Sequence, residues 1–133
     1  MVHSTDRTAE RYAGRGLTGL ANIGNTCYLN SCLQALSATH GLSEFLDDPA
    51  YRRLSTGPSM QLLAEWDDLR KMMWKQNSTI APRRFVETVQ RRSATKQGSQ
   101  FHGFAQNDVS EFLFFIIDAF DEALRRPVKI TIK

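Results

Sequence analysis

The sequence has few cysteines, no long apolar run and little excess charge of either sign. It contains two cysteines in 133 residues, and its formal net charge is +3. Cys27 and Cys32 cannot supply a disulfide framework or the four ligands of a structural zinc site. No apolar stretch approaches the ~18 residues that a membrane span needs. We therefore expect no metal, no cofactor and no membrane, and a reducing compartment such as the cytoplasm or nucleus.

The N-terminal segment also lacks the apolar core of a signal peptide. Residues 1–16 are polar and mixed in charge, and we expect them to form a flexible leader. The whole chain is 41% hydrophobic and 23% charged, which is ordinary for a soluble globular protein. Its length suits one domain, or part of one, over residues 17–133.

The basic residues occur in scattered pairs rather than in one continuous patch. These pairs are Arg52-Arg53, Arg83-Arg84, Arg91-Arg92 and Arg125-Arg126. They lie among acidic residues and are not interleaved with aromatic residues. We interpret them as solvated helix faces and loop edges, which makes nucleic acid an unlikely partner.

Apolar residues at helical spacing predict five helices, with Gly41, Pro49 and Pro82 marking where helices end or begin. The predicted helices cover residues 27–41, 42–48, 60–74, 82–90 and 107–124. Residues 91–100 are polar and are predicted to form a loop. Trp66 lies on the apolar stripe of the third helix, and we expect it in the core.

The last of these helices is the most apolar. Val109, Phe112, Ile116 and Phe120 line one side of it, and further apolar residues surround them. A helix that is apolar around most of its circumference is normally buried on several sides. We therefore expect residues 107–124 to form the central core helix.

The C-terminal residues predict a strand. Residues 128–133 alternate between apolar and polar side chains, which is typical of a half-buried strand. No second strand is apparent elsewhere in the sequence. Because a single strand leaves its backbone groups without partners, we expect it to pair with a segment from outside this chain.

Cys27 lies at a predicted junction between a glycine-containing loop and a helix. Asn25 and Thr26 are suitable N-cap residues ahead of it. Backbone N–H groups at a helix N-terminus favour an anion, and the thiolate is the nucleophilic form of cysteine. The position therefore suits a catalytic thiol, although small core filler is the alternative reading of any cysteine on an apolar helix. Cys32, within the helix, is interpreted as structural.

Three segments of this sequence together resemble the ubiquitin-specific proteases. Residues 19–36 match the family's cysteine box, Gly-Leu-x-Asn-Leu-Gly-Asn-Thr-Cys-Tyr/Phe-x-Asn-Ser-x-Leu-Gln, with Ile23 in place of leucine. Residues 101–113 resemble the second box, Gly-Tyr-x-Gln-Gln-Asp-Ala-x-Glu-Phe-Leu, with Phe104 and Asn107 as departures. Residues 80–85 are similar to a short Ser-Pro-x-x-Phe segment. The resemblance covers about residues 17–126.

The resemblance implies a mainly α chain, the helical, thumb-like half of a papain-like α+β cysteine peptidase fold. It implies a thiol-dependent deubiquitinase that hydrolyses the bond after the C-terminal glycine of ubiquitin, with ubiquitin or ubiquitinated proteins as partners. Cys27 matches the nucleophile, and Asn22 matches the residue whose side-chain amide helps to hold the oxyanion. Without the family pattern, Asn22 would be read as a loop asparagine that satisfies its own turn.

Residues of the second box are expected beside the cleft that receives the arginine-containing tail of ubiquitin. Asp108 and Glu111 are three residues apart and can share a helix face, where carboxylates can pair with guanidinium groups. The simpler interpretation is that Asp108, in the first turn of a helix, complements the helix dipole. Gln106 is expected to support the cysteine-bearing segment rather than to touch substrate.

The catalytic histidine of the family lies in a C-terminal box that this sequence does not contain. His3 lies in the leader, His40 is expected at the end of the first helix, pointing away from Cys27, and His102 precedes the second box. We expect none to replace the family base, although His102 is the one remaining candidate. The chain alone is therefore expected to be inactive without the missing C-terminal part of the catalytic domain.

The alternative hypothesis is a non-catalytic module that binds ubiquitin or another partner through a degenerate cleft. The intact pair of Cys27 and Asn22 argues against it, because a module that only binds needs neither group. A small structural or nucleic-acid adaptor has little beyond the net charge in its favour.

Overall fold

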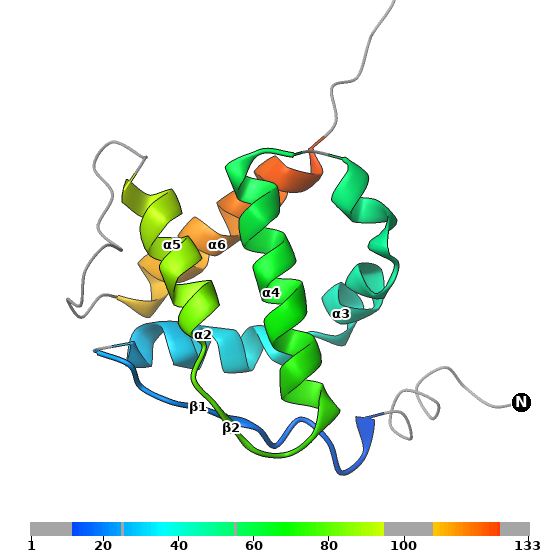
Figure 1. Cartoon of the computed structure of the whole chain (residues 1–133), viewed down its shortest axis with the longest axis vertical. Coiled ribbons are helices and arrows are strands. Elements are labelled where there is room, and N and C mark those ends of the chain that lie inside the picture. The colour runs from blue at the N-terminus through cyan, green and yellow to red at the C-terminus, as the bar shows by residue number, and fades with distance from the viewer. Residues whose placement is uncertain (1–11, 25, 55, 95–107, 126–133) are drawn as a thin grey trace, which may run out of the picture.

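The computed structural model describes residues 12–24, 26–54, 56–94 and 108–125. Their helices and strands are β1 (Gly19–Leu20), α2 (Cys27–Ser37), α3 (His40–Asp47), the 3-10 helix η1 (Pro49–Arg53), α4 (Pro58–Lys75), β2 (Thr79–Ile80), α5 (Arg83–Ala94) and α6 (Val109–Leu124). The prediction of a mainly helical chain is confirmed (Figure 1). The predicted strand at 128–133, residues 1–11 of the predicted leader, and Gln106 lie outside the described residues.

The helix α4 runs through the middle of the molecule, and the other helices pack around it. Figure 1 shows α5 on one side of α4 and α3 on the other, with α2 and α6 crossing it. Trp66 of α4 is fully buried and meets Phe85 of α5 edge to face, with ring centroids 6.2 Å apart. Phe85 and Val89 of α5 are buried as predicted from the Pro82 segment. The core therefore forms around α4, which was predicted only as one of several helices.

The prediction that the helix at 107–124 is central and buried on several sides is wrong for the described residues. One stripe of α6 is buried, comprising Phe112, Ile116, Ala119, Phe120 and Ala123. The opposite side is exposed, with Ile117 at 53% and Phe114 at 74%, and Val109, the first residue of the helix, is 43% exposed. Apolar side chains all around a helix show that it has several surfaces suited to burial, but not which segments cover them.

The described residues contain two short strands that sequence reasoning missed. β1 and β2 pair in parallel, with Gly19 opposite Thr79 and Leu20 opposite Ile80. The Gly19 amide donates to the Ser78 carbonyl oxygen at 2.8 Å. Strands of two residues are too short to show an alternating pattern, so hydrophobic periodicity does not predict them.

Several predicted helix boundaries also differ from the structure. The first helix ends at Ser37 rather than Gly41, and His40 begins α3 instead of ending α2. The amides of Ala38 and Thr39 reach back three residues, to the carbonyls of Ala35 and Leu36, which tightens the end of α2. The helix α5 continues to Ala94, four residues into the predicted loop at 91–100.

Residues 12–16 contact the C-terminal end of α4. The Arg15 guanidinium donates from Nε and Nη2 to the Trp74 carbonyl oxygen, at 3.2 and 2.9 Å. The Tyr12 ring meets the Trp74 indole edge to face at 5.1 Å. Contacts with the core therefore begin ahead of the boundary expected between residues 16 and 17.

A buried carboxylate joins α4 to the segment after α3. The Asp67 side chain is 1% exposed and accepts a 2.6 Å hydrogen bond from the Tyr51 hydroxyl. Arg52 and Arg70 form ion pairs with it at 2.9 and 2.7 Å. Burial alone would raise the pKa of Asp67, but the hydrogen bonds from Tyr51 and Arg52 and the charges of Arg70 and Lys71 outweigh it and lower that pKa.

Among the residues that the structure describes, no helix combines the length and the apolar character needed to cross a membrane.

Candidate functional site

Cys27 is the first residue of α2, and its side chain is exposed. The residue before it, Thr26, is the N-cap and is buried. Cys32, one and a half turns along the helix, lies in the core, where burial raises the pKa of its thiol. The structure therefore separates the two cysteines as the sequence predicted, with one accessible sulfur at a helix start and one packed in the core.

The loop from Asn22 to Thr26 is fixed by its own side chains. Asn22 Oδ1 accepts hydrogen bonds from the amides of Gly24 at 3.1 Å and Thr26 at 3.2 Å. The Ile23 amide donates to Thr26 Oγ1 at 3.1 Å. Gly24 adopts φ of 109°, a left-handed conformation that favours glycine.

Asn22 therefore satisfies its own turn, as its simpler reading predicted. This does not conflict with a role in holding an oxyanion, because only the side-chain oxygen is used in the turn. The amide nitrogen Nδ2 carries two N–H donors, and Asn22 as a residue is exposed. An amide whose oxygen is held in place presents its donors in a defined direction, which suits the binding of a developing negative charge.

Two further side-chain amides of the cysteine box bind α2 to the preceding segment, and neither residue was assigned a role from the sequence. Asn30 Nδ2 lies 3.0 Å from the Ala21 carbonyl oxygen and 3.3 Å from that of Leu20. Gln34 Nε2 donates to the Thr18 carbonyl oxygen at 2.8 Å. The signal was present in the spacing, since two amides four residues apart lie on one helix face.

The described part of the second box, residues 108–113, includes the start of α6, which lies close to the start of α2. Asp108 is the N-cap of α6, and its Oδ1 accepts from the amides of Ser110 at 2.7 Å and Glu111 at 3.4 Å. This bears out the helix-end role that the simpler reading gave Asp108. Both Asp108 and Glu111 are exposed. The two carboxylates therefore lie on the first turn of α6, where they complement its dipole.

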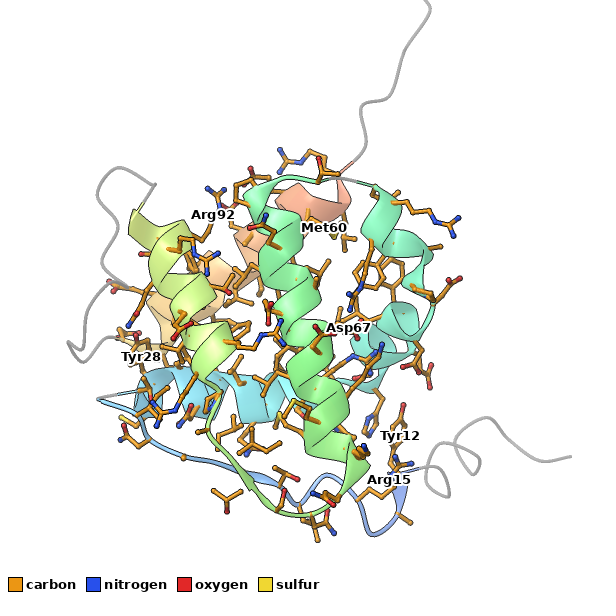
Figure 2. The ribbon with its side chains drawn as sticks, viewed as in Figure 1. Tyr12, Arg15, Tyr28, Met60, Asp67 and Arg92 are labelled. Carbon is orange, nitrogen blue, oxygen red and sulfur yellow. The ribbon has the colours of Figure 1, made fainter. Side chains whose placement is uncertain are left out.

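An aromatic contact brings the two boxes together. Tyr28, directly after Cys27, meets Phe112, directly after Glu111, with ring centroids 5.5 Å apart and planes at 77°. Figure 2 shows Tyr28 at the N-terminal end of α2. Consequently, the helix starts that carry Cys27 and Asp108 pack against each other through the core.

The one histidine among the described residues, His40, lies beyond the C-terminal end of α2, at the start of α3. The His40 ring stacks on Tyr12 with centroids 3.9 Å apart and is edge-on to Trp74 at 5.9 Å. The 11 residues of α2 separate it from Cys27, which corresponds to roughly 16 Å of helix. Within the described part of the chain, then, no imidazole lies beside Cys27, and His3 and His102 fall outside that part.

One surface cavity, of about 150 Å³, is also distant from Cys27. Its lining includes Tyr12, Arg15, Arg70 and Trp74. Figure 2 shows Tyr12 and Arg15 near the opposite end of the molecule from Tyr28. The cations of this cavity also have structural partners, such as the Trp74 carbonyl for Arg15, so we do not assign the chemistry to it.

Comparison with known proteins connects this geometry to a reaction class. The sequence model of one family, described as ubiquitin carboxyl-terminal hydrolase, matches residues 18–132. The chain is 38% identical over 120 residues to rat "Ubiquitin carboxyl-terminal hydrolase 4", covering 86% of this chain and 12% of that protein.

Two other relatives also match most of this chain. Human "Ubiquitin carboxyl-terminal hydrolase 15" is 38% identical over 117 residues, which covers 84% of this chain and 11% of the relative. The fruit-fly protein "Ubiquitin carboxyl-terminal hydrolase Usp2" is 33% identical over 128 residues, which covers 96% and 13%. The chain thus spans about an eighth of the length of these relatives.

Proposed function

The chain belongs to the ubiquitin carboxyl-terminal hydrolase family, and we propose that it supplies the nucleophile and oxyanion side of a thiol-dependent deubiquitinase. The observation that carries this proposal is the exposed Cys27 at the start of α2, directly after a loop whose hydrogen bonds fix Asn22. The bond to be cleaved is the peptide or isopeptide bond after the C-terminal glycine of ubiquitin.

The chemistry proceeds in two steps. The Cys27 thiolate attacks the carbonyl carbon of the terminal glycine, and the carbonyl oxygen becomes an oxyanion that accepts a hydrogen bond from Asn22 Nδ2. The C–N bond then breaks, and the leaving amine takes a proton from an imidazolium. Water, deprotonated by the same imidazole, hydrolyses the resulting thioester, which returns the Cys27 sulfur and releases ubiquitin with a free carboxylate.

The imidazole comes from outside the described residues under this proposal. By resemblance to the family, it belongs to a histidine-bearing C-terminal part of the catalytic domain, which is the principal partner we propose for this chain. The exposed apolar side of α6, including Phe114 and Ile117, supports the need for such a covering segment. The chain alone is therefore proposed to be inactive.

We assign substrate contacts to the start of α6. Asp108 and Glu111 are exposed on its first turn, close to the α2 start through the contact of Tyr28 with Phe112. Carboxylates bind guanidinium groups in bidentate geometry, which suits an arginine-containing ubiquitin tail. Gln106, by resemblance, supports the cysteine-bearing segment.

Turnover of a ubiquitin–fluorophore conjugate tests the proposal. In a complete catalytic domain that contains this chain, Cys27→Ala should abolish turnover, and Asn22→Ala should lower kcat by roughly 100-fold or more. Cys32→Ser is the matched control, because it alters the other thiol and should retain turnover. The chain of 133 residues should show only background hydrolysis. Ubiquitin binding without turnover in the complete domain would favour the non-catalytic module.

A further inference from the structure

We propose that Asn30 and Gln34 are positioning residues that hold Asn22 in register with Cys27. Neither side chain is assigned to the reacting atoms. They act through the backbone of residues 18–21, which leads directly into Asn22. This inference rests on the proposed function and extends it to the question of what keeps the oxyanion donor in place.

The hydrogen bonds from α2 reach the backbone on the N-terminal side of Asn22. Asn30 Nδ2 lies 3.0 Å from the carbonyl oxygen of Ala21, the residue immediately before Asn22. Gln34, one helical turn further along, donates at 2.8 Å to the carbonyl oxygen of Thr18. Two amides on one helix face therefore fasten a stretch of four residues to α2.

The C-terminal side of the same loop is fastened to the same helix. The Thr26 amide donates to Asn22 Oδ1 at 3.2 Å, and the Thr26 carbonyl accepts from the Asn30 amide at 2.8 Å. Asn30 is thus bonded on both sides of the loop, through its side chain to Ala21 and through its backbone to Thr26. Asn22 and Cys27 cannot move apart without breaking one of these hydrogen bonds.

The opposite edge of this segment is held by β2. The amides of Gly19 and Ala21 donate to the carbonyls of Ser78 and Ile80, both at 2.8 Å. The segment before Asn22 therefore lies between the paired strand on one side and the amides of α2 on the other. The pairing with residues 78–80 uses the amides of Gly19 and Ala21, whereas Asn30 and Gln34 bind the carbonyl oxygens of Ala21 and Thr18.

The consequence for catalysis follows from the geometry of oxyanion binding. A donor accelerates the reaction when it is already aimed at the developing charge. A displacement of about 1 Å at a reacting group can cost up to ~100-fold in rate. Loss of one of two anchors should displace Asn22 by less than this, so we expect about a tenfold decrease in kcat.

Three variants test this in a complete catalytic domain that contains the chain. Asn30→Leu and Gln34→Met remove the donors while keeping side-chain size. Asn77→Leu is the matched control. Asn77 Nδ2 donates to the Gly14 carbonyl oxygen at 3.0 Å and its Oδ1 accepts from the Leu17 amide at 3.1 Å, so its contacts end one residue before the anchored stretch 18–21. We expect kcat to fall about tenfold for the first two variants with KM unchanged, and to stay within twofold for the control.

A double-mutant cycle separates positioning from a general structural role. If Asn30 acts through Asn22, then Asn30→Leu in an Asn22→Ala background should lower kcat by less than about twofold. A full tenfold decrease in that background would overturn the proposal. Should Asn30→Leu fail to fold, the same cycle with Gln34→Met gives the answer. Absence of turnover in the unmutated domain would instead count against the proposed function.

Amide hydrogen exchange tests the geometry without activity. In the chain of 133 residues, the amides of Gly24 and Thr26 donate to Asn22 Oδ1. Asn30→Leu should accelerate their exchange about tenfold, whereas Asn77→Leu should leave it unchanged. Unchanged exchange in Asn30→Leu would overturn the anchoring itself.

Discussion

The ring of Tyr28 meets the ring of Phe112 edge to face, with centroids 5.5 Å apart, and both side chains are buried. The contact joins the beginning of α2, one residue after Cys27, to the beginning of α6, one residue after Glu111. Edge-to-face pairs are a favoured arrangement of aromatic rings and contribute beyond their buried area. This contact links the two sequence boxes that carry the proposed chemistry.

We predict that Phe112→Ala lowers the free energy of unfolding by about 3–5 kcal/mol, because it removes a fully buried ring and leaves a cavity between α2 and α6. Phe114→Ala is the matched control on the same helix, since Phe114 is 74% exposed, and it should change stability by less than about 0.5 kcal/mol. Urea unfolding followed by circular dichroism measures both. Equal effects of the two substitutions would contradict the burial pattern of α6.

Gly24, in the loop that precedes Cys27, should tolerate substitution poorly. Its φ of 109° strains any residue with a Cβ, so Gly24→Ala should destabilise the chain by about 1–2 kcal/mol. Gly41, within α3, has open space around an added Cβ, and Gly41→Ala should stabilise the folded chain by about 0.5–1 kcal/mol. Opposite signs in thermal melts are expected. A neutral Gly24→Ala would show that the loop conformation is not required.

Asp67 should govern stability in acid. Because its pKa is lowered in the folded chain, the unfolded chain binds the proton first as pH falls below about 4, and unfolding becomes more favourable. Asp67→Asn should cost about 1–3 kcal/mol at pH 7, since the buried Arg70 loses the nearer of its carboxylate partners and keeps Asp47. Asp68→Asn, which alters a solvent-exposed partner of Arg52, should cost less than about 1 kcal/mol. Urea unfolding at pH 7 and pH 3 tests this, and equal acid sensitivity of Asp67→Asn and the unmutated chain would contradict it.

Tyr51 should make the stability of the folded chain depend on pH in the alkaline range. Burial and the hydrogen bond to Asp67 raise the pKa of Tyr51 to about 12. Above the ordinary tyrosine pKa of about 10, the unfolded chain releases the proton while the folded chain retains it, so stability falls as pH rises. Tyr51→Phe lacks this titration, and the stability difference between the two proteins should narrow between about pH 10 and 12. A constant difference over that range would exclude the buried hydroxyl as its source.

Much of the site could be predicted from the sequence because it depends on local patterns. The helix start at Cys27 and the buried Cys32 follow from helical spacing, and the Asp108 cap follows from N-cap chemistry. Thr26 precedes α2 without a side-chain cap hydrogen bond. The inward faces of Phe85 and Val89 follow from the same periodicity. These features need only a few neighbouring residues to be specified.

The features that were missed depend on contacts between distant segments. The pairing of β1 with β2 joins residues 60 positions apart and leaves no alternating pattern in two residues. The spacing of Asn30 and Gln34 places both amides on one helix face, but it does not show that residues 18–21 lie beside that face. The exposed side of α6 was misjudged because the sequence shows which faces are apolar but not what covers them.

The most direct test of the account is to locate the covalent bond formed with ubiquitin that carries a C-terminal electrophile. A complete catalytic domain that contains this chain is incubated with the probe, digested and mapped by mass spectrometry. The account predicts one ubiquitin on Cys27, lost in Cys27→Ala and retained in Cys32→Ser. An adduct on any other residue, or ubiquitin binding without a covalent bond, would contradict it.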